Sequence, residues 1–278
     1  MTRRFCTTLI TRTFVYAFVI FMSFTAIAPI TIMWMSSLKT SAELYINPLG
    51  LPRYWKFENF ILAWNKSHLG VYMLNSIKVT IPALALVLIC ASLAGYALAV
   101  FRFKGQLIIL SLFLIGLMIP SISIITPLYF TMVDMGLHNT HLGLIFVETA
   151  AALPLSIYLM RSSFLDIPRE LREAVLTDGG NDFDVFSKVM LPLARPAIMS
   201  VTVLSFLQVW NGYLFPLILI NTNELLTMPL ALSFLQGRYQ TDIVLVVAGT
   251  TLISLPTILI YILLQRQFIE GIAEGALK

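Results

Sequence analysis

Five long runs without a charged residue constrain this sequence more than any other feature. They occupy residues 13–38, 79–101, 105–133, 196–223 and 243–265. A helix of about 20 apolar residues spans the ~30 Å hydrocarbon core of a bilayer, so each run is long enough to cross it. Because 58% of the residues are hydrophobic and only 12% are charged, the chain cannot cover its surface with polar groups. The sequence predicts an all-α, polytopic membrane protein and disfavours a disordered chain, a disulfide-stapled secreted domain or a cytosolic enzyme.

Charges and turn residues divide these runs into six predicted transmembrane helices, which together form one transmembrane domain over residues 1–278. We place them at about 14–35, 79–101, 106–129, 142–161, 197–220 and 243–265. A cleaved signal peptide is the alternative for the first, because Arg3 and Arg4 precede an apolar stretch that contains Ala26-Ile27-Ala28. The stretch continues to Met35, past the roughly 15 residues of a signal core, which favours a retained helix.

The distribution of Lys and Arg predicts the orientation. With six crossings both termini lie on one side, and twelve of the 18 basic residues lie on that side: Arg3, Arg4, Arg12, Arg102, Lys104, Arg161, Arg169, Arg172, Lys188, Arg195, Arg266 and Lys278. The positive-inside rule therefore predicts a multi-pass protein of the cell (inner or plasma) membrane, with both termini and the loops 102–105 and 162–195 in the cytoplasm. The modest net charge of +4 fits membrane orientation rather than nucleic-acid binding. The outer loop 36–78 is rich in aromatic and turn residues, which predicts one or two short interfacial helices.

The cytoplasmic segment 162–195 predicts two short helices. Asp166 is a candidate N-cap, Pro168 suits a first turn, and Gly179 can end the first helix after Thr177. One face of this helix carries an apolar stripe, and the helix is too short to form a core alone, so it needs a partner. The stripe consists of Ile167, Leu171, Ala174 and Val175. The second helix begins at Asn181 or Asp182 and ends at Leu191-Pro192.

The same segment carries a family resemblance. Glu173-Ala174-Val175, Asp178-Gly179, Phe186 and Leu191-Pro192 resemble the EAA loop of ABC importer permeases, with Val175 and Gly180 in place of alanines of that pattern. Residues along the rest of the chain are similar to the MalG-like branch that serves carbohydrate uptake: Ser37-Leu38-Lys39, Asn75-Ser76, Trp210-Asn211, Gln265–Gly271 and Gly275-Ala276.

The resemblance implies a type I ABC importer permease fold and a coupling role for the loop. It implies that Glu173 meets a basic residue of a cytoplasmic ATPase, that the stripe of Ile167, Leu171, Ala174 and Val175 fills a groove on it, and that Asp178-Gly179 sets the angle to the next helix. Leu191-Pro192 completes the motif. The alternative is an interfacial helix that only joins two crossings. The C-terminal tail 266–278 resembles one that reaches the ATPase dimer, and the alternative is a solvated end.

The resemblance also implies the partners: a second related permease, two ATPase subunits, an extracytoplasmic solute-binding protein and a sugar substrate. The sequence has no Gly-rich loop that ends in Lys-Ser or Lys-Thr, the element that cradles nucleotide phosphates. We therefore expect a non-catalytic subunit without a cofactor of its own, with ATP and Mg²⁺ bound by the partner ATPase.

Polar residues at membrane depth are candidates for a substrate pathway, because such groups are costly unless they face a cavity or another helix. The candidates are Glu148, Gln208, Trp210, Asn211 and Tyr213. Carboxylate, amide and phenol groups can hydrogen-bond sugar hydroxyls, and an indole can stack on a sugar ring. The alternatives are interhelical hydrogen bonds, ordinary aromatic packing and, for Glu148, the outer interface.

Two further features lie outside the membrane segments. The loop 221–241 resembles one that reaches into the docked binding protein in maltose-type systems, with Gln236-Gly237 as its tip. His138 and His141 are three residues apart, but two histidines without nearby thiols or further carboxylates make a weak metal site, so we expect loop residues.

The sequence leaves several functions open. The main prediction is the permease of an ATP-driven importer for a sugar or oligosaccharide. The alternatives are an importer of glycerol-3-phosphate or another polar solute, and an ion-coupled secondary transporter, which predicts inverted repeats that we do not find. An intramembrane enzyme would need a nucleophile with a base or a metal cluster in the bilayer, and the sequence shows neither.

Overall fold

The computed structural model describes residues 2–66, 68–238 and 243–276, with the side chains of 12–66, 68–234 and 243–265. Every regular element in this described part is helical, which confirms the all-α prediction. The contacts divide the chain into two units. The first comprises the part before Gly70 together with Phe234–Leu252, and the second comprises Gly70–Ser233 together with the part after Leu252.

Four described helices are long and apolar enough to span a bilayer, or six if each of two bent helix pairs counts as one span. The four lie in α1 (Thr2–Ser37), α4 (Leu69–Val100), α7 (His141–Asp166) and α14 (Ile243–Ala276). α4 begins ten residues before the predicted crossing at 79–101, and α7 ends five residues after the predicted end at 161.

In the first unit, a buried lysine organises the loop after α1. Lys39 is fully buried, and its Nζ donates hydrogen bonds to the carbonyl oxygens of Asn47 and Pro48 at 2.8 and 2.9 Å. The Asn59 amide donates to the carbonyl oxygens of Ser37 and Lys39 at 2.8 and 2.9 Å. This loop contains two short helices, α2 (Ser41–Ile46) and α3 (Glu58–Lys66), as the aromatic and turn residues of 36–78 predict.

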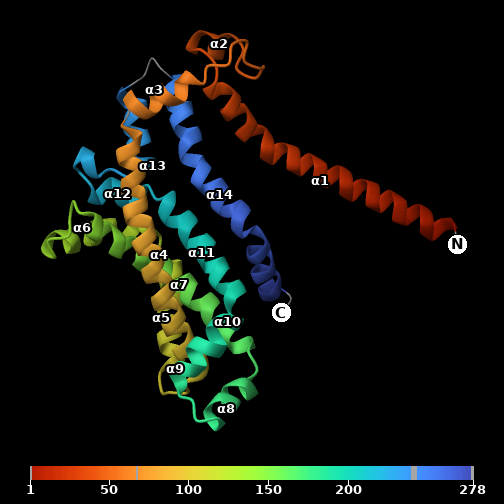
Figure 1. The fold of residues 1–278 in the computed structure, drawn as a ribbon, viewed down its shortest axis with the longest axis vertical. Coiled ribbons are helices and arrows are strands. Elements are labelled where there is room, and N and C mark those ends of the chain that lie inside the picture. The colour runs from red at the N-terminus through yellow and green to blue at the C-terminus, as the bar shows by residue number, and fades with distance from the viewer. Residues whose placement is uncertain (1, 67, 239–242, 277–278) are drawn as a thin grey trace. The chain divides into compact units, whose positions relative to one another are not determined.

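In the second unit, α4, α7 and α11 (Arg195–Trp210) run lengthwise and share a hydrophobic core (Figure 1). Val87, Met160 and Val201 from the three helices are fully buried in it. α4 and α7 approach each other closely at Gly95 of α4, where an added Cβ would stand 2.8 Å from Met160 Cβ and 2.9 Å from the Arg161 nitrogen. Only glycine allows α4 and α7 to come this close.

Two of the predicted crossings contain breaks. The segment 106–129 forms α5 (Gln106–Met118), a 3₁₀ turn η1 (Ser121–Ile124) and α6 (Ile125–Asp134), with a bend of 99°. Ile119 has φ −84° and ψ 116°, the extended conformation favoured before proline, and Pro120 has no N–H to donate. The segment 197–220 forms α11, a break at 211–213 and α12 (Leu214–Leu219). An apolar run therefore predicts membrane-compatible residues but not a continuous helix.

At one end of the second unit, amide side chains tie three segments together. Asn75 of α4 donates to the carbonyl oxygens of Glu224 and Leu226 at 2.7 and 3.0 Å. The Ser76 hydroxyl accepts a hydrogen bond from the Met228 nitrogen at 2.9 Å. Asn139 accepts from the nitrogens of Asn221 and Thr222. These segments include the 3₁₀ turn η3 (Asn223–Leu225) and the start of α13 (Met228–Arg238). Asn75-Ser76, a pair that carries the family resemblance, thus has a structural role.

Candidate functional site

The loop predicted to be the coupling element lies at the opposite end of the second unit (Figure 1) and begins with α8 (Arg169–Thr177). The prediction that Asp166 caps this helix is wrong, because Asp166 is the last residue of α7 and Pro168 occupies the N-cap position. Ile167, which precedes the proline, is extended with ψ 127°. The proline therefore sets the boundary between the two helices, and no side chain caps α8 at this end.

The C-terminus of α8 ends as predicted at a glycine. Gly179 has φ +86°, the left-handed conformation that glycine adopts without strain. Its nitrogen donates to the Leu176 carbonyl oxygen at 3.2 Å, and the Gly180 nitrogen donates to the Val175 carbonyl oxygen at 2.9 Å. These two bonds form a Schellman motif, which turns the chain sharply after Asp178, the exposed C-cap residue.

The second short helix begins at Asn181 with a capping box. The Asn181 side chain accepts from the nitrogens of Phe183 and Asp184, and Asp184 accepts from the Asn181 nitrogen at 3.0 Å. The helix runs as α9 (Asp182–Asp184), a π-helical turn η2 (Val185–Met190) and α10 (Leu191–Leu193). It meets α11 at an angle of 74°.

Two ion pairs stabilise this turn. Arg172 of α8 lies 2.9 Å from Asp182 of α9, and the hydrogen bond from Arg172 to this carboxylate raises the pKa of the guanidinium. Lys188 lies 2.7 Å from Asp184. The hydrogen bonds from Lys188 and from the Asn181 backbone hold the pKa of Asp184 below its ordinary value. Both pairs are partly exposed, so they fix the geometry more than they add stability.

The apolar stripe of α8 divides into two sets. Ile167 and Val175 pack against the core cluster of the second unit, whereas Leu171 and Ala174 are exposed, Leu171 by 42%. Glu173 is exposed as well. Leu176 of α8 and Phe183 of α9 are also exposed, Phe183 by 72%, and the stripe prediction did not include them. The sequence pattern alone did not indicate that these two side chains are exposed. Farther along, Leu191 packs on the core and Pro192 is exposed.

An aromatic cluster attaches the loop to two long helices. Tyr96 of α4 lies 5.1 Å from Phe186 of η2 and 6.0 Å from Phe164 of α7, measured between ring centroids. The Tyr96 hydroxyl donates to the Asp182 carbonyl oxygen at 3.3 Å. Because Phe164 and Phe186 are 2% and 8% exposed, this cluster is a packed base rather than a flexible tether.

The predicted pathway residues fall into exposed and buried sets. Gln208, Asn211 and Tyr213 are exposed around the break between α11 and α12. Trp210 is only 3% exposed; it stacks on Phe206 at 5.5 Å, and its Nε1 donates to the Ile253 carbonyl oxygen at 3.3 Å. Its indole is therefore engaged in packing within this chain.

Glu148 lies beside the same break. It is 2% exposed, and its Oε1 has no hydrogen-bond partner among the described residues. An added Cβ at Gly212 would stand 2.7 Å from this oxygen and 3.0 Å from the Val209 carbonyl oxygen. Gly212 thus leaves the space that the carboxylate occupies, next to the exposed groups of Asn211 and Tyr213.

The remaining predicted residues are placed as follows. Gln236 and Gly237 lie at the end of α13, in a stretch whose side chains are outside the described residues. His138 packs edge-on against Tyr129 at 4.9 Å, and His141 lies 2.9 Å from the Leu225 carbonyl oxygen. In the described part of the chain, His, Cys, Asp and Glu form no cluster of three or more that could hold a metal ion.

Comparisons with known proteins identify the family. Residues 89–273 match the model of the binding-protein-dependent transport system inner membrane component family. The chain is 35% identical over 266 residues to the diacetylchitobiose uptake system permease protein NgcG of Streptomyces coelicolor, covering 95% of this chain and 88% of that protein. It is 32% identical to the melibiose/raffinose/stachyose import permease protein MelC of Bacillus subtilis, covering 90% and 91%.

A solved structure shares the fold. It is the crystal structure of a bacterial ABC transporter involved in the import of the acidic polysaccharide alginate. The two folds agree with a TM-score of 0.79 at 23% sequence identity, and the match covers 93% of this chain and 96% of that chain. The sequence match, the EAA-like loop and this fold agree: the chain belongs to the family of inner membrane components of binding-protein-dependent transport systems.

Proposed function

We propose that the chain is one permease subunit of an ATP-driven importer for a sugar or oligosaccharide. Its relatives NgcG and MelC are named for uptake of saccharides, which favours this substrate class over glycerol-3-phosphate. The subunit pairs with a related permease, two ATPase subunits that bind ATP and Mg²⁺, and an extracytoplasmic binding protein. The first transmembrane helix fits such an assembly, since none of its most apolar window is buried among the described residues.

The observation that carries the proposal is the outward face of α8. Leu171, Ala174 and Glu173 are all exposed on this helix, which has a fixed end and a packed aromatic base. Exposed apolar side chains beside a carboxylate form the kind of helical face that docks into a groove with a basic rim. We propose that a partner ATPase covers this face and that its movement reaches α4 and α7 through Phe186.

A charge-reversal pair tests the coupling role. Glu173→Lys is expected to lower uptake by about tenfold or more, because reversing a charge in a buried interface costs at least ~2 kcal/mol. Glu170→Lys is the matched control: Glu170 is exposed on the same helix but is not part of the proposed contact. Equal uptake by the two variants, at equal amounts of folded protein in the membrane, would refute the assignment.

We further propose that Gln208, Asn211 and Tyr213 contact the solute. They are exposed at a break between two helices, where amides and a phenol can exchange hydrogen bonds with hydroxyl groups without unfolding a helix. Glu148, enclosed beside Gly212, supports this surface from beneath. Asn211→Ala is expected to weaken uptake while the assembled complex remains intact, and unchanged uptake would contradict the pathway.

A further inference from the structure

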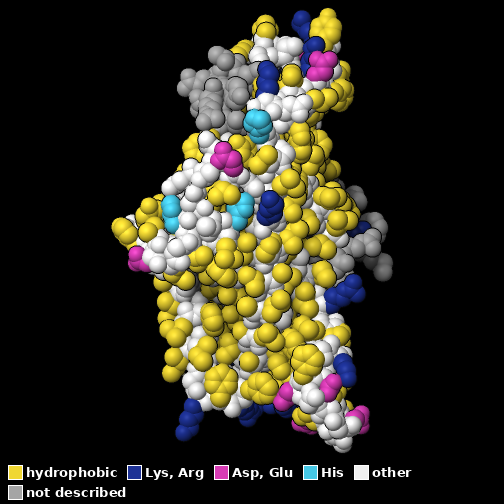
Figure 2. All heavy atoms as spheres, turned by 60° about the vertical axis from the view of Figure 1, so that its left-hand side comes forward, with side chains coloured by type: hydrophobic (Ala, Val, Ile, Leu, Met, Phe, Trp, Pro, Cys, Tyr) yellow, Lys and Arg dark blue, Asp and Glu magenta, His cyan; other side chains and the backbone are white. Residues whose placement is uncertain are grey.

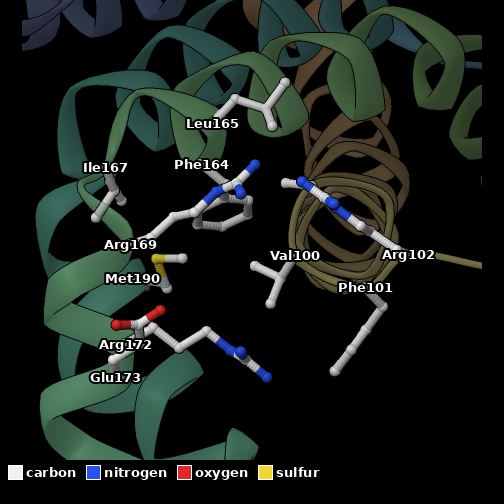
Figure 3. Close-up of a pocket in the computed structure, with 11 residues that line it drawn as sticks. Val100, Phe101, Arg102, Phe164, Leu165, Ile167, Arg169, Arg172, Glu173 and Met190 are labelled. Carbon is white, nitrogen blue, oxygen red and sulfur yellow. The ribbon is translucent and has the colours of Figure 1, made fainter.

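A second site lies beside α8 and shares Glu173 with the proposed ATPase contact. A pocket of about 390 Å³ opens between the end of α4, the loop after it, the end of α7 and the start of α8. In Figure 3, Arg169 and Arg102 extend into it from opposite sides, with Arg172 and Glu173 below. All of these residues belong to the second unit.

The pocket has an excess of positive charge. Three guanidinium groups and one carboxylate line it, and Asp182 pairs with Arg172 from outside the lining. The ion pairs of the described residues, Arg172–Asp182 and Lys188–Asp184, leave Arg102 and Arg169 without an acidic partner. The Nε of Arg172 is buried and has no hydrogen-bond partner among the described groups. The site therefore offers unused donors and uncompensated charge to an anion.

The walls of the pocket are apolar. Phe164 and Met190, which are 2% and 4% exposed, close it on the side of the core. Phe101 and Leu165, which also line it, are 38% and 47% exposed. Figure 2 shows that this unit is mainly hydrophobic along its length, and that charged side chains gather at the end that holds α8 and α9. The pocket thus lies at the ends of two helices that are apolar enough to span a bilayer.

We propose that this pocket binds the phosphate of an anionic phospholipid headgroup, with the acyl chains along Phe101 and Leu165. Guanidinium groups recognise phosphate oxygens through paired hydrogen bonds, and basic pockets between transmembrane helices on the cytoplasmic side suit anionic headgroups. Free phosphate shares this chemistry, but it would not use the exposed apolar side chains at the mouth. The inference rests on the proposed function for its orientation, in which this end faces the cytoplasmic leaflet.

Lipid selectivity of the full chain tests this site without ATP or uptake. The chain is reconstituted into phosphatidylcholine vesicles, and the association of spin-labelled phosphatidylglycerol is compared with that of spin-labelled phosphatidylcholine. The double variant Arg102→Gln/Arg169→Gln is expected to reduce the preference for phosphatidylglycerol by about tenfold or more, since each basic residue near an anionic membrane surface contributes ~1 kcal/mol. Arg195→Gln, which removes an exposed arginine that does not line the pocket, is expected to retain the preference.

Three outcomes would overturn the proposal. The first is a double variant with the same preference for phosphatidylglycerol as the wild type. The second is a loss of this preference in Arg195→Gln as large as that in the double variant. The third is binding of inorganic phosphate at the arginines without any preference for phosphatidylglycerol. Because Arg102 and Arg169 are exposed, the variants are expected to fold, and equal thermal unfolding checks this. Normal lipid selectivity with failed ATP coupling would reject only the importer proposal, whereas normal coupling with no selectivity would reject only the lipid site.

Discussion

Arg172 and Asp182 lie 2.9 Å apart and join α8 to α9 across the glycine turn. Their side chains are 30% and 44% exposed, so solvent screens the pair. A double-mutant cycle of Arg172→Gln and Asp182→Asn is expected to give a coupling free energy of about 0.5–1 kcal/mol, measured from thermal unfolding of the purified chain. Strict additivity of the two single variants would show that the pair is not formed in the protein.

Gly179 should tolerate only residues that accept a left-handed backbone. At φ +86°, Gly179→Val is expected to destabilise the turn by about 1–2 kcal/mol and to reduce uptake, because a β-branched residue is strained there. Gly179→Asn is the matched variant and is expected to keep most uptake, since asparagine enters this region more readily. An added Cβ meets no atom within 4 Å, so a steric clash would not explain the difference. Equal uptake by both variants would contradict the role of the turn.

Because Glu148 lies close to Gly212, we expect that shortening Glu148 restores stability lost when Gly212 is enlarged. Gly212→Ala is expected to lower stability by about 1–3 kcal/mol, because its Cβ would stand 2.7 Å from Glu148 Oε1 inside a packed region. Shortening the partner in the double variant Glu148→Ala/Gly212→Ala should recover part of this loss. Thermal unfolding of the four proteins measures the interaction, and a double variant that is merely additive would rule out the contact.

The contact between α4 and α7 is expected to be sensitive to one methyl group. Gly95→Ala places a Cβ 2.8 Å from Met160 Cβ and should cost about 1–3 kcal/mol. Gly116→Ala is the control, since its Cβ would lie at an ordinary 3.6 Å from Pro154 Cγ. Its cost should not exceed the ~1 kcal/mol that replacement of an exposed helical residue involves. Similar unfolding temperatures for both variants would place the two helices farther apart than described.

The contribution of Asp184 should depend on pH. Its pKa is lowered by hydrogen bonds from Lys188 and from the Asn181 backbone. The stabilisation by its carboxylate is therefore complete above the pKa of the unfolded chain and is lost as the pH falls through the lower pKa of the folded loop. Asp184→Asn is expected to unfold more easily than the wild type at neutral pH, with a difference that shrinks on acidification. A difference that grows on acidification would contradict the sign of the shift.

The tyrosine at the helix break has a matched control elsewhere in the chain. Tyr213 is 43% exposed beside the proposed pathway, and Tyr158 of α7 is 44% exposed. Tyr213→Phe removes a hydroxyl that can bond a sugar and is expected to reduce uptake by about threefold to tenfold, as for loss of one hydrogen bond. Tyr158→Phe should leave uptake unchanged. Equal effects of the two substitutions would refute a role of Tyr213 in solute contact.

The sequence predicts the long helices well, because the absence of charge over a span of membrane thickness leaves few alternatives. It does not predict the bend near Pro120 or the helix break at Gly212, since hydropathy reports on side chains and the breaks arise from the backbone. The start of α8 shows the same limit: Asp166 has the chemistry of a cap, but the conformation imposed before Pro168 decides where α7 ends.

Side-chain periodicity predicted the apolar stripe of α8 but not which of its members face outward. Ile167 and Val175 share a stripe with Leu171, yet they face the core of their own unit while Leu171 faces outward. Trp210 has the properties of a sugar-stacking residue, but Phe206 and the Ile253 carbonyl already occupy its ring face and its N–H. Such competition depends on residues far away in the chain, and one sequence does not reveal it.

Tyr96, Phe164 and Phe186 form one packed group of rings between the short loop and two long helices. If α8 docks on an ATPase as proposed, these rings would pass its displacement on to α4 and α7, because closely packed side chains have low compressibility. Tyr96→Leu would then weaken the coupling between α8 and the long helices, but it would leave the exposed face of α8, and with it the binding of the ATPase, unchanged.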